Sequence, residues 1–424
     1  MDINPFNLLQ IPVEITELAL VLAHPKDVAR FAQTCRAARA LVYDSRDQHL
    51  WRRMFLAHPF DDPRMNSLGS VSPDALSYDW KSELQRRVSA ADIIRKCGDT
   101  DPLVRTAALQ TLVSVIMNAP PVITDDRSQS KSLSWIMEVI DDGALFRVEN
   151  HTEEEVQLTA RLRCYLGFFD EDKVGRPSAE LRTVARCFVY DLRNYSSSNR
   201  WGPYIRDNSR RVNWKHVEAI ITVVYLNLVH LGGMWQDTRP PLGVEATRAY
   251  SAPGSLHRDP RDWAGVEGCW RRYVCFMDYR DLFAFNFSTT TDVGPYDPSF
   301  FEDVDFNEAV RLIELRLRVT NYTNTPSTYP KIEFTGLSRG ANGQEAKVRG
   351  SVSMGDDGVV RWRFRWKSSI YDGHSQWSSE GIQIGCVGSA AGIVGTWTGA
   401  QHEDGEPAGP FWLWKVNDDH PTHV

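Results

Sequence analysis

The segment Val359-Val360-Arg361-Trp362-Arg363-Phe364-Arg365-Trp366 decides the fold of the C-terminal half of this chain. From Val360 onward, apolar residues alternate with arginines in steps of two. A period of two with one apolar face is typical of an antiparallel strand that has a buried side and a solvated side. The segment therefore predicts a β-strand at 359–367.

Seven further strands are predicted around this one. Residues 311–319 show the same alternation, and turn sequences such as Gly355-Asp356-Asp357-Gly358 separate most of the segments. The eight predicted strands span 268–277, 310–320, 331–337, 346–353, 359–367, 379–386, 391–398 and 409–416. Several strands joined by such turns predict an up-and-down barrel or a sandwich.

The first predicted strand contains the triplet Gly268-Cys269-Trp270, and a second Gly-x-Trp triplet follows at Gly395-Thr396-Trp397. The position of the first triplet resembles that in lipocalin-like (calycin) barrels. The resemblance favours a barrel no more than a sandwich, and both remain open.

The exposed side of the strand at 359–367 carries Arg361, Arg363 and Arg365. This row is either a binding stripe for an acidic peptide, a solvated face, or an edge protected by charge. The tryptophans Trp362, Trp366, Trp397, Trp412 and Trp414 either pack the interior or line a groove at the mouth of the barrel. The candidate substrate-binding residues are Arg361, Arg363, Arg365, Trp397, His402 and Trp412.

The N-terminus predicts a group of three short helices. Ile15, Leu18 and Leu22 form one helical stripe after Pro12, which suits the first helical position. Pro25 is expected to end that helix, and a second stripe runs from Val28 to Cys35. A third apolar group consists of Leu41, Leu50 and Trp51. Helices this short bury little surface, so this region is expected to need another protein or the rest of its own chain.

These residues resemble an F-box, the module that docks on a Skp-type adaptor. The matching positions are Ile11-Pro12-Val13-Glu14-Ile15, Asp27-Val28, Cys35-Arg36 and Leu50-Trp51. The resemblance implies adaptor contact, or its immediate support, by Leu9, Ile11, Pro12, Ile15, Leu18, Leu22, Val28, Phe31 and Trp51. A helical hairpin packed on its own chain is the alternative.

The C-terminal half resembles that of fungal F-box domain-containing proteins. The resemblance rests on Trp263–Gly268 with Asp278–Leu282, on Glu380–Gly385, on Gly392–Thr398 with His402, and on Gly409–Lys415. Together with the N-terminus it covers most of the chain, but it implies no particular substrate.

The expected organisation is a multidomain α+β protein. It comprises an F-box at 5–56, a connection at 57–83, a helical connector domain at 84–235, a linker at 236–262, an antiparallel β-domain at 263–416 and a tail at 417–424. In the connector, helices are expected at 102–117, 133–140 and 181–192, after a capping box at Thr152 and Glu155, and after Asn213.

Composition narrows the class of partner. The 424 residues carry a net charge of −7, which argues against a dedicated nucleic-acid binder. The seven cysteines form no Cys-x-x-Cys pair, and reduced thiols are expected. No signal peptide or membrane span is evident, so a cytoplasmic or nuclear location is expected. No metal site or cofactor is expected.

One sequence motif could indicate an enzyme. Gly336-Leu337-Ser338-Arg339-Gly340 matches the nucleophile elbow of hydrolases, but that motif needs a helix after the serine, and a turn is predicted here instead. The predicted function is therefore that of a non-enzymatic substrate receptor of a Skp–cullin–F-box ubiquitin ligase, with an adaptor, a cullin and an unknown protein substrate as partners. The alternative is a free-standing barrel that binds a small apolar ligand or a peptide and has a degenerate F-box.

Overall fold

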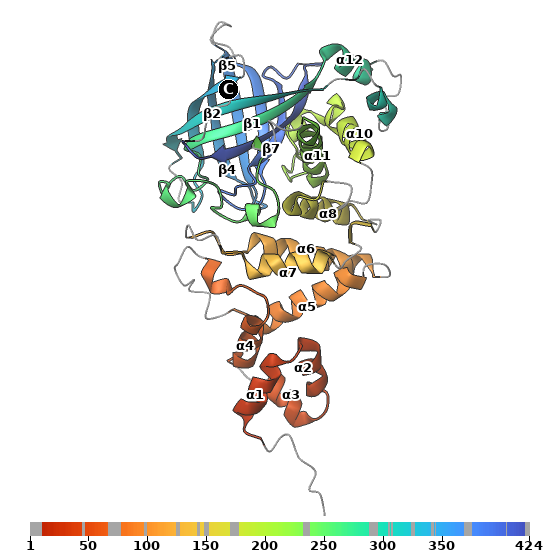
Figure 1. Cartoon of the computed structure of the whole chain (residues 1–424), viewed down its shortest axis with the longest axis vertical. Coiled ribbons are helices and arrows are strands. Elements are labelled where there is room, and N and C mark those ends of the chain that lie inside the picture. Colours follow the sequence, from red (N-terminus) through yellow and green to blue (C-terminus); the bar gives the residue numbers. More distant parts are fainter. Residues whose placement is uncertain are drawn as a thin grey trace, which may run out of the picture. The chain divides into compact units, whose positions relative to one another are not determined.

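The computed structural model shows two compact units, one formed by residues 1–120 and 128–148 and the other by residues 121–127 and 149–424 (Figure 1). The residues that the structure describes are 11–44, 47–66, 78–96, 100–123, 128–141, 145–147, 152–169, 178–231, 238–287, 296–303, 306, 308–323, 327–340, 343, 345–368, 375–403 and 405–419.

The first unit begins with four short helices rather than the three predicted. They are α1 (Val13–Leu22), α2 (Pro25–Ala32), α3 (Arg36–Tyr43) and α4 (His49–Ala57). Pro25 starts α2 instead of merely ending α1, because a proline fits the first helical turn, where no N–H is needed. Cys35 adopts an extended backbone, and its Sγ accepts a hydrogen bond from Ala38 N at 3.4 Å. This cap starts α3. The third predicted apolar group is divided between two helices, with Leu41 on α3 and Leu50 and Trp51 on α4.

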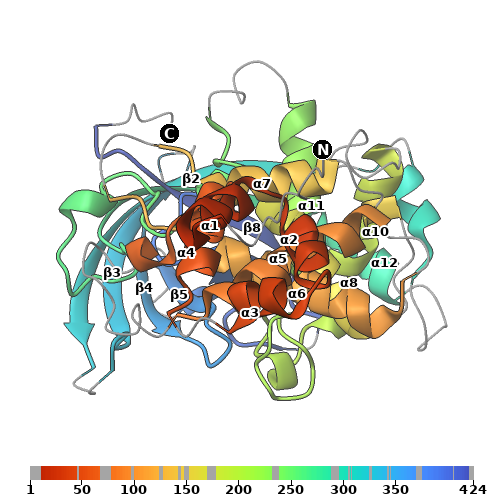
Figure 2. The same ribbon diagram turned by 90° about the horizontal axis from the view of Figure 1, so that it is seen from below.

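These four helices share a small apolar core. In Figure 2, α1 lies beside α4, and α2 lies beside α3. Val28, Val42 and Met54 are fully buried, and the indole of Trp51 donates from Nε1 to the carbonyl of Val42 at 2.9 Å. The rest of the unit consists of the longer helices α5 (Trp80–Lys96), α6 (Pro102–Met117) and α7 (Lys131–Asp141), with 3-10 turns at Pro63–Asn66 and Leu145–Arg147.

The second unit combines helices with a closed barrel. Its helices are α8 (Glu153–Leu166), α10 (Ser178–Val189), α11 (Trp214–His230) and α12 (Tyr279–Phe287), and a 3-10 helix, η10, spans Pro298–Glu302. The predicted caps form: Thr152 and Glu155 make a capping box on α8, and Asn213 Oδ1 accepts from His216 N at the start of α11. The predicted connector at 84–235 thus contributes helices to both units.

The eight strands form one antiparallel barrel, β1 to β8 in chain order, and β8 pairs with β1 to close it. The closed ring resolves the choice between barrel and sandwich. The strands are β1 (Gly268–Met277), β2 (Glu308–Tyr322), β3 (Ile332–Gly340), β4 (Glu345–Met354), β5 (Val360–Ser368), β6 (Ser375–Gln383), β7 (Ile393–Gly399) and β8 (Ala408–Val416). All eight predicted strands are present. The largest difference is at β6, which spans 375–383 instead of the predicted 379–386. The strand ends earlier because Ile384 to Gly392 form a tight loop.

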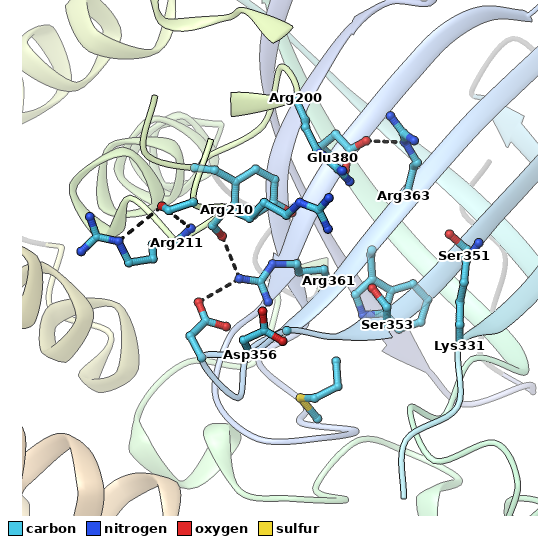
Figure 3. Close-up of a pocket in the computed structure, with 16 residues that line it drawn as sticks. Arg200, Arg210, Arg211, Lys331, Ser351, Ser353, Asp356, Arg361, Arg363 and Glu380 are labelled. Carbon is cyan, nitrogen blue, oxygen red and sulfur yellow. Dashed lines mark hydrogen bonds and ion pairs between the residues drawn. The ribbon is translucent and has the colours of Figure 1, made fainter. Parts of the chain in front are cut away.

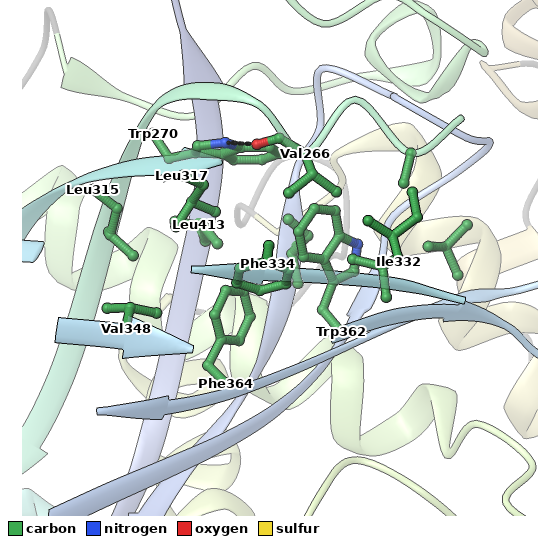
Figure 4. Close-up of a cluster of buried hydrophobic side chains, with 14 of the residues drawn as sticks. Val266, Trp270, Leu315, Leu317, Ile332, Phe334, Val348, Trp362, Phe364 and Leu413 are labelled. Carbon is green, nitrogen blue, oxygen red and sulfur yellow. Dashed lines mark hydrogen bonds between the residues drawn. The ribbon is translucent and has the colours of Figure 1, made fainter. Parts of the chain in front are cut away.

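Aromatic side chains fill the barrel interior (Figure 4). Trp362 packs edge-on against Trp270, with ring centroids 5.4 Å apart, and beside Phe364 at 5.9 Å. Because β5 alternates, Val360, Trp362, Phe364 and Trp366 point inward while the arginines between them point out.

One cation lies among these rings. The Arg272 side chain is buried, donates from Nη2 to Ser379 Oγ at 2.9 Å, and lies 4.2 Å from the centroid of Trp366 and 4.4 Å from that of Phe411. Burial without a carboxylate lowers the pKa of Arg272 to about 9. The ring faces supply the compensating attraction.

The segment before β1 closes one end of the barrel. Trp270 Nε1 donates to Val266 O at 2.9 Å, and Asp262 accepts hydrogen bonds from the backbone of Val266 and Glu267. Lys415 Nζ donates to Gly265 O at 3.0 Å and lies over the Trp270 ring. These contacts fix the first and last strands at the same end.

Where the structure describes it, the predicted linker at 236–262 packs against the barrel and is not an extended connection. Tyr250 N donates to Val387 O, Ala252 N to Gly388 O, and Cys386 N to Thr247 O. Helix α11 covers the neighbouring outer wall formed by β1, β7 and β8 (Figure 1). Trp412 and Trp414 are therefore buried under this cover. Among the described residues, no helix has the length and apolar character needed to cross a membrane.

Candidate functional site

A basic hollow of about 260 Å³ lies on the outside of the barrel, where β4, β5 and β6 meet the loop at 200–211. We call it the cationic pocket. Its charged lining residues are Arg200, Arg210, Arg211, Lys331, Arg361, Arg363, Asp356, Asp357 and Glu380. Six cations against three acids make it a site that favours an anion.

Strand β5 places the two central arginines of the pocket. Arg361 and Arg363 point outward from alternate positions and reach the same hollow (Figure 3). Arg361 Nη2 contacts Asp357 Oδ2 at 2.8 Å and Arg210 O at 2.8 Å. Arg363 lies directly opposite Glu380 on β6, and Arg363 Nε is 2.5 Å from Glu380 Oε1. Each arginine therefore already has an acidic neighbour that an incoming anion must displace or share.

The loop at 200–211 holds an unusual backbone conformation over the pocket. Arg200, Trp201, Asn208 and Arg210 all have positive φ angles between 54° and 62°. For residues with a side chain, this conformation costs energy and persists only where surrounding contacts enforce it. Strain of this kind gathers at ligand sites more often than elsewhere.

Contacts with β7 and with His402, which follows this strand, enforce that conformation. The Trp201 ring stacks on His402 with centroids 3.8 Å apart, and Thr396 Oγ1 donates to Trp201 O at 2.8 Å. A side chain at Gly202 would clash with Glu380, because a Cβ there would lie 2.7 Å from the Cβ of that residue. The loop is thus fitted closely to the strand that carries the buried acid.

Glu380 is the titrating group of the pocket. Its side chain is only 9% exposed. Burial raises the pKa of Glu380 to about 7, although Arg363 opposes the shift. Burial also lowers the pKa of the nearby His402, and the charges of Arg365 and Arg363 add to that effect. The net charge of the pocket therefore changes near neutral pH.

A second basic surface adjoins the pocket on β4 and β5. We call Lys347, Arg349, Arg365 and Lys367 the cationic face; all four are exposed. Lys347 lies directly opposite Lys367, and Arg349 directly opposite Arg365. A shallow hollow of about 540 Å³ on this face shares Lys331, Ser351 and Arg363 with the cationic pocket, so the two are continuous.

Like charges directly opposite each other in an antiparallel pair are destabilising. We therefore expect Arg349→Glu to raise the free energy of unfolding by about 0.5–1 kcal/mol, because a carboxylate would then face Arg365. Arg349→Gln, which only removes the repulsion, is the matched control and should give a smaller gain. Urea unfolding measures both, and a loss of stability in the glutamate variant would show that the repulsion is not felt.

The structure brings together most of the predicted substrate-binding residues. Arg361 and Arg363 line the pocket, Arg365 belongs to the cationic face, and His402 supports the loop. Two tryptophans lie elsewhere. Trp397 is half-buried and donates from Nε1 to Cys275 O, and Trp412 is 1% exposed and donates to Ala391 O. Trp412 is accordingly part of the packing and does not reach the surface.

Sequence reasoning missed Glu380 and the loop at 200–211. Glu380 follows a serine pair in a strand, and nothing local marks it as the partner of Arg363. For the loop, the signal was present: turn residues at Gly202-Pro203 and Asp207-Asn208-Ser209 are interleaved with arginines.

The predicted adaptor-binding residues fall into two groups. Pro12, Ile15, Leu18 and Leu22 are exposed, whereas Val28 and Trp51 are buried within the four-helix group and can only support the exposed ones. Ile11 and Phe31 are half-buried, and Leu9 lies outside the described residues.

Helix α1 buries one side and leaves the other open. Leu20 and Val21 pack inward, while Ile15, Leu18 and Leu22 are 55%, 45% and 81% exposed. Their i, i+3 and i+7 spacing puts them on a single face. An exposed apolar face of this kind marks an interaction surface more often than a random surface does.

Ser338 does not form a nucleophile elbow. It lies within β3, is 5% exposed, and its Oγ donates to Ala346 O at 3.2 Å on the neighbouring strand. The elbow requires a serine held at a sharp turn from a strand into a helix. The Gly336–Gly340 motif is therefore explained by strand packing.

No family model matches the chain, and neither the curated proteins nor the solved structures contain a significant match.

Proposed function

We propose that this chain is an F-box-type substrate receptor of a Skp–cullin–F-box ubiquitin ligase. In this role the four short N-terminal helices dock on the Skp-type adaptor, and the barrel unit holds the protein to be modified. The catalytic chemistry belongs to other subunits, and the receptor acts by raising the local concentration of target lysines near the charged ubiquitin.

One observation carries the proposal: the apolar face of α1 formed by Ile15, Leu18 and Leu22. Leu20 and Val21 are the apolar side chains of α1 that are buried, whereas these three keep about half or more of their surface exposed. Burying three exposed aliphatic side chains in a partner would contribute several kcal/mol at about 25 cal/mol per Å². The face begins at Ile15, the last residue of the segment Ile11–Ile15, whose sequence resembles the start of an F-box.

The barrel unit supports the second half of the proposal. Its interior is filled by aromatic side chains, whereas its outer wall carries the cationic pocket and the cationic face. A surface site of this kind suits recognition of another macromolecule better than enclosure of a small ligand.

Co-purification with a Skp-type adaptor tests the docking half. The chain co-expressed with the adaptor should form a stable complex, and Pro12→Ala/Ile15→Ala should weaken it because both side chains are exposed, Pro12 just before α1 and Ile15 on it. Leu103→Ala, at another exposed leucine in the same unit, is the matched control and should leave the complex unchanged. A robust complex with the double variant would show that α1 is not the docking helix.

A further inference from the structure

We propose that the cationic face and the adjoining cationic pocket bind an extended acidic segment of the recruited protein, with acidic side chains at alternate positions. The inference deepens the receptor role and rests on it for its biological meaning, but the binding itself needs no adaptor.

The pairing of like charges is the first observation. Lys347 and Lys367, like Arg349 and Arg365, face each other across β4 and β5. None of the four has an ion pair or hydrogen bond from its side chain to any residue within the described part of the chain. Protection of a sheet edge does not account for them, because β4 and β5 each have two paired neighbours in the closed barrel. Repulsion within the two pairs therefore opposes folding locally, and acidic groups of a bound partner would relieve it.

The geometry of the surface favours an extended chain. Outward-facing residues recur at every second position of β4 and β5, about 6.6 Å apart, and an extended peptide presents its own side chains at the same repeat. The hollow on the face shares Arg363 and Ser351 with the pocket, so a segment lying along it reaches Arg363 at its end.

Two observations favour a polypeptide over a nucleic acid. The whole chain carries a charge of −7, which opposes the long uniform anion of a duplex. Leu337 lies directly opposite Lys347 on β3 and is half exposed, so the face includes an apolar contact for a side chain beside the cations. A segment that mixes carboxylates with an occasional apolar residue matches this pattern.

Fluorescence anisotropy with the purified full-length chain tests the inference. The probe is a short labelled peptide in which aspartate alternates with serine and leucine, and its comparison is the same peptide with asparagine for aspartate. Lys347→Gln/Lys367→Gln and Arg349→Gln/Arg365→Gln should each weaken binding of the acidic peptide by about tenfold. Added salt should weaken binding by the wild-type chain more than by either variant.

The control removes the same charge elsewhere. Arg53→Gln/Arg280→Gln changes two exposed cations on helices and should leave the affinity unchanged. The inference is overturned if the face variants bind as well as the wild type, if the asparagine peptide binds equally, or if an oligonucleotide or anionic vesicle of matched charge binds more tightly. Because no adaptor is present, failure here leaves the docking proposal standing, and failure of the adaptor complex leaves this one standing.

Discussion

Replacing Glu308 by glutamine is expected to lower the free energy of unfolding by about 3–5 kcal/mol. Glu308 joins β2 to α10 and α11 through a buried network. Arg186 contacts Glu308 Oε2 through both Nε and Nη2 at 2.8 Å, Asn227 Nδ2 donates to the same oxygen at 2.7 Å, and the Tyr190 hydroxyl donates to Oε1. The Arg186 and Glu308 side chains are 8% and 1% exposed, so the variant leaves a buried cation without its counter-charge.

Chemical denaturation measures the loss, with Glu333→Gln as the matched control. Glu333 pairs with Lys331 at the surface, and loss of that pair should cost less than about 1 kcal/mol. A double variant, Arg186→Met/Glu308→Leu, should recover part of the loss because it removes both charges together. Equal effects of Glu308→Gln and Glu333→Gln would contradict the account of the network.

Glu380→Gln is expected to raise the free energy of unfolding, and the gain should grow as the pH rises from 4.5 towards 7. Since burial raises the pKa of Glu380 to about 7 from 4.5, the folded chain holds a proton there that the unfolded chain has lost. This contribution to stability is complete below the unfolded pKa and is lost as the pH rises through 7. The glutamine variant has no charge to bury, so above neutral pH its free energy of unfolding should exceed that of the wild type by roughly 3 kcal/mol.

Unfolding measured from about pH 4 to about pH 8.5 tests this expectation. The two proteins should be nearly equal at the acid end and diverge as the pH rises. Glu403→Gln, at an exposed position, is the control and should show the wild-type profile. Parallel profiles for Glu380→Gln and the wild type would mean that Glu380 titrates as an ordinary surface acid.

The strands were predictable because their signal is local. Alternation along 359–367 specifies which side chains face inward, and the structure confirms it from Val360 to Trp366. Closure of the barrel depends on pairing between β1 and β8, the first and last strands of the barrel in the sequence. No local pattern encodes that pairing, so barrel and sandwich could not be separated from sequence.

The candidate site likewise combines residues with a local sequence signal and residues that only long-range contacts bring together. Arg361 and Arg363 were predicted from a local row, but Glu380 becomes the partner of Arg363 only through the register of β5 with β6. The loop at 200–211 reaches the pocket through contacts with Thr396 and His402, almost two hundred residues further along the chain. Long-range contacts of this kind determine the electrostatics of the pocket.

At the N-terminus, the helices were expected but their number was wrong. The third predicted apolar group is divided between α3, which carries Leu41, and α4, which carries Leu50 and Trp51. Helix α3 starts at a cap by Cys35, a residue type that rarely serves as a cap. The spacing of Ile15, Leu18 and Leu22 predicted one apolar stripe on this helix, and only the structure shows that the stripe is exposed.

The dissociation constant for the purified Skp-type adaptor, measured by calorimetric titration, tests the receptor role most directly. We expect the wild-type chain to bind, and Leu18→Asp/Leu22→Asp to lose at least about a hundredfold in affinity because two charges would enter an apolar interface. Leu103→Asp, at a leucine that is 78% exposed at the start of α6, should bind as the wild type does. Absence of binding by the wild type, or equal binding by the α1 variant, would contradict the account.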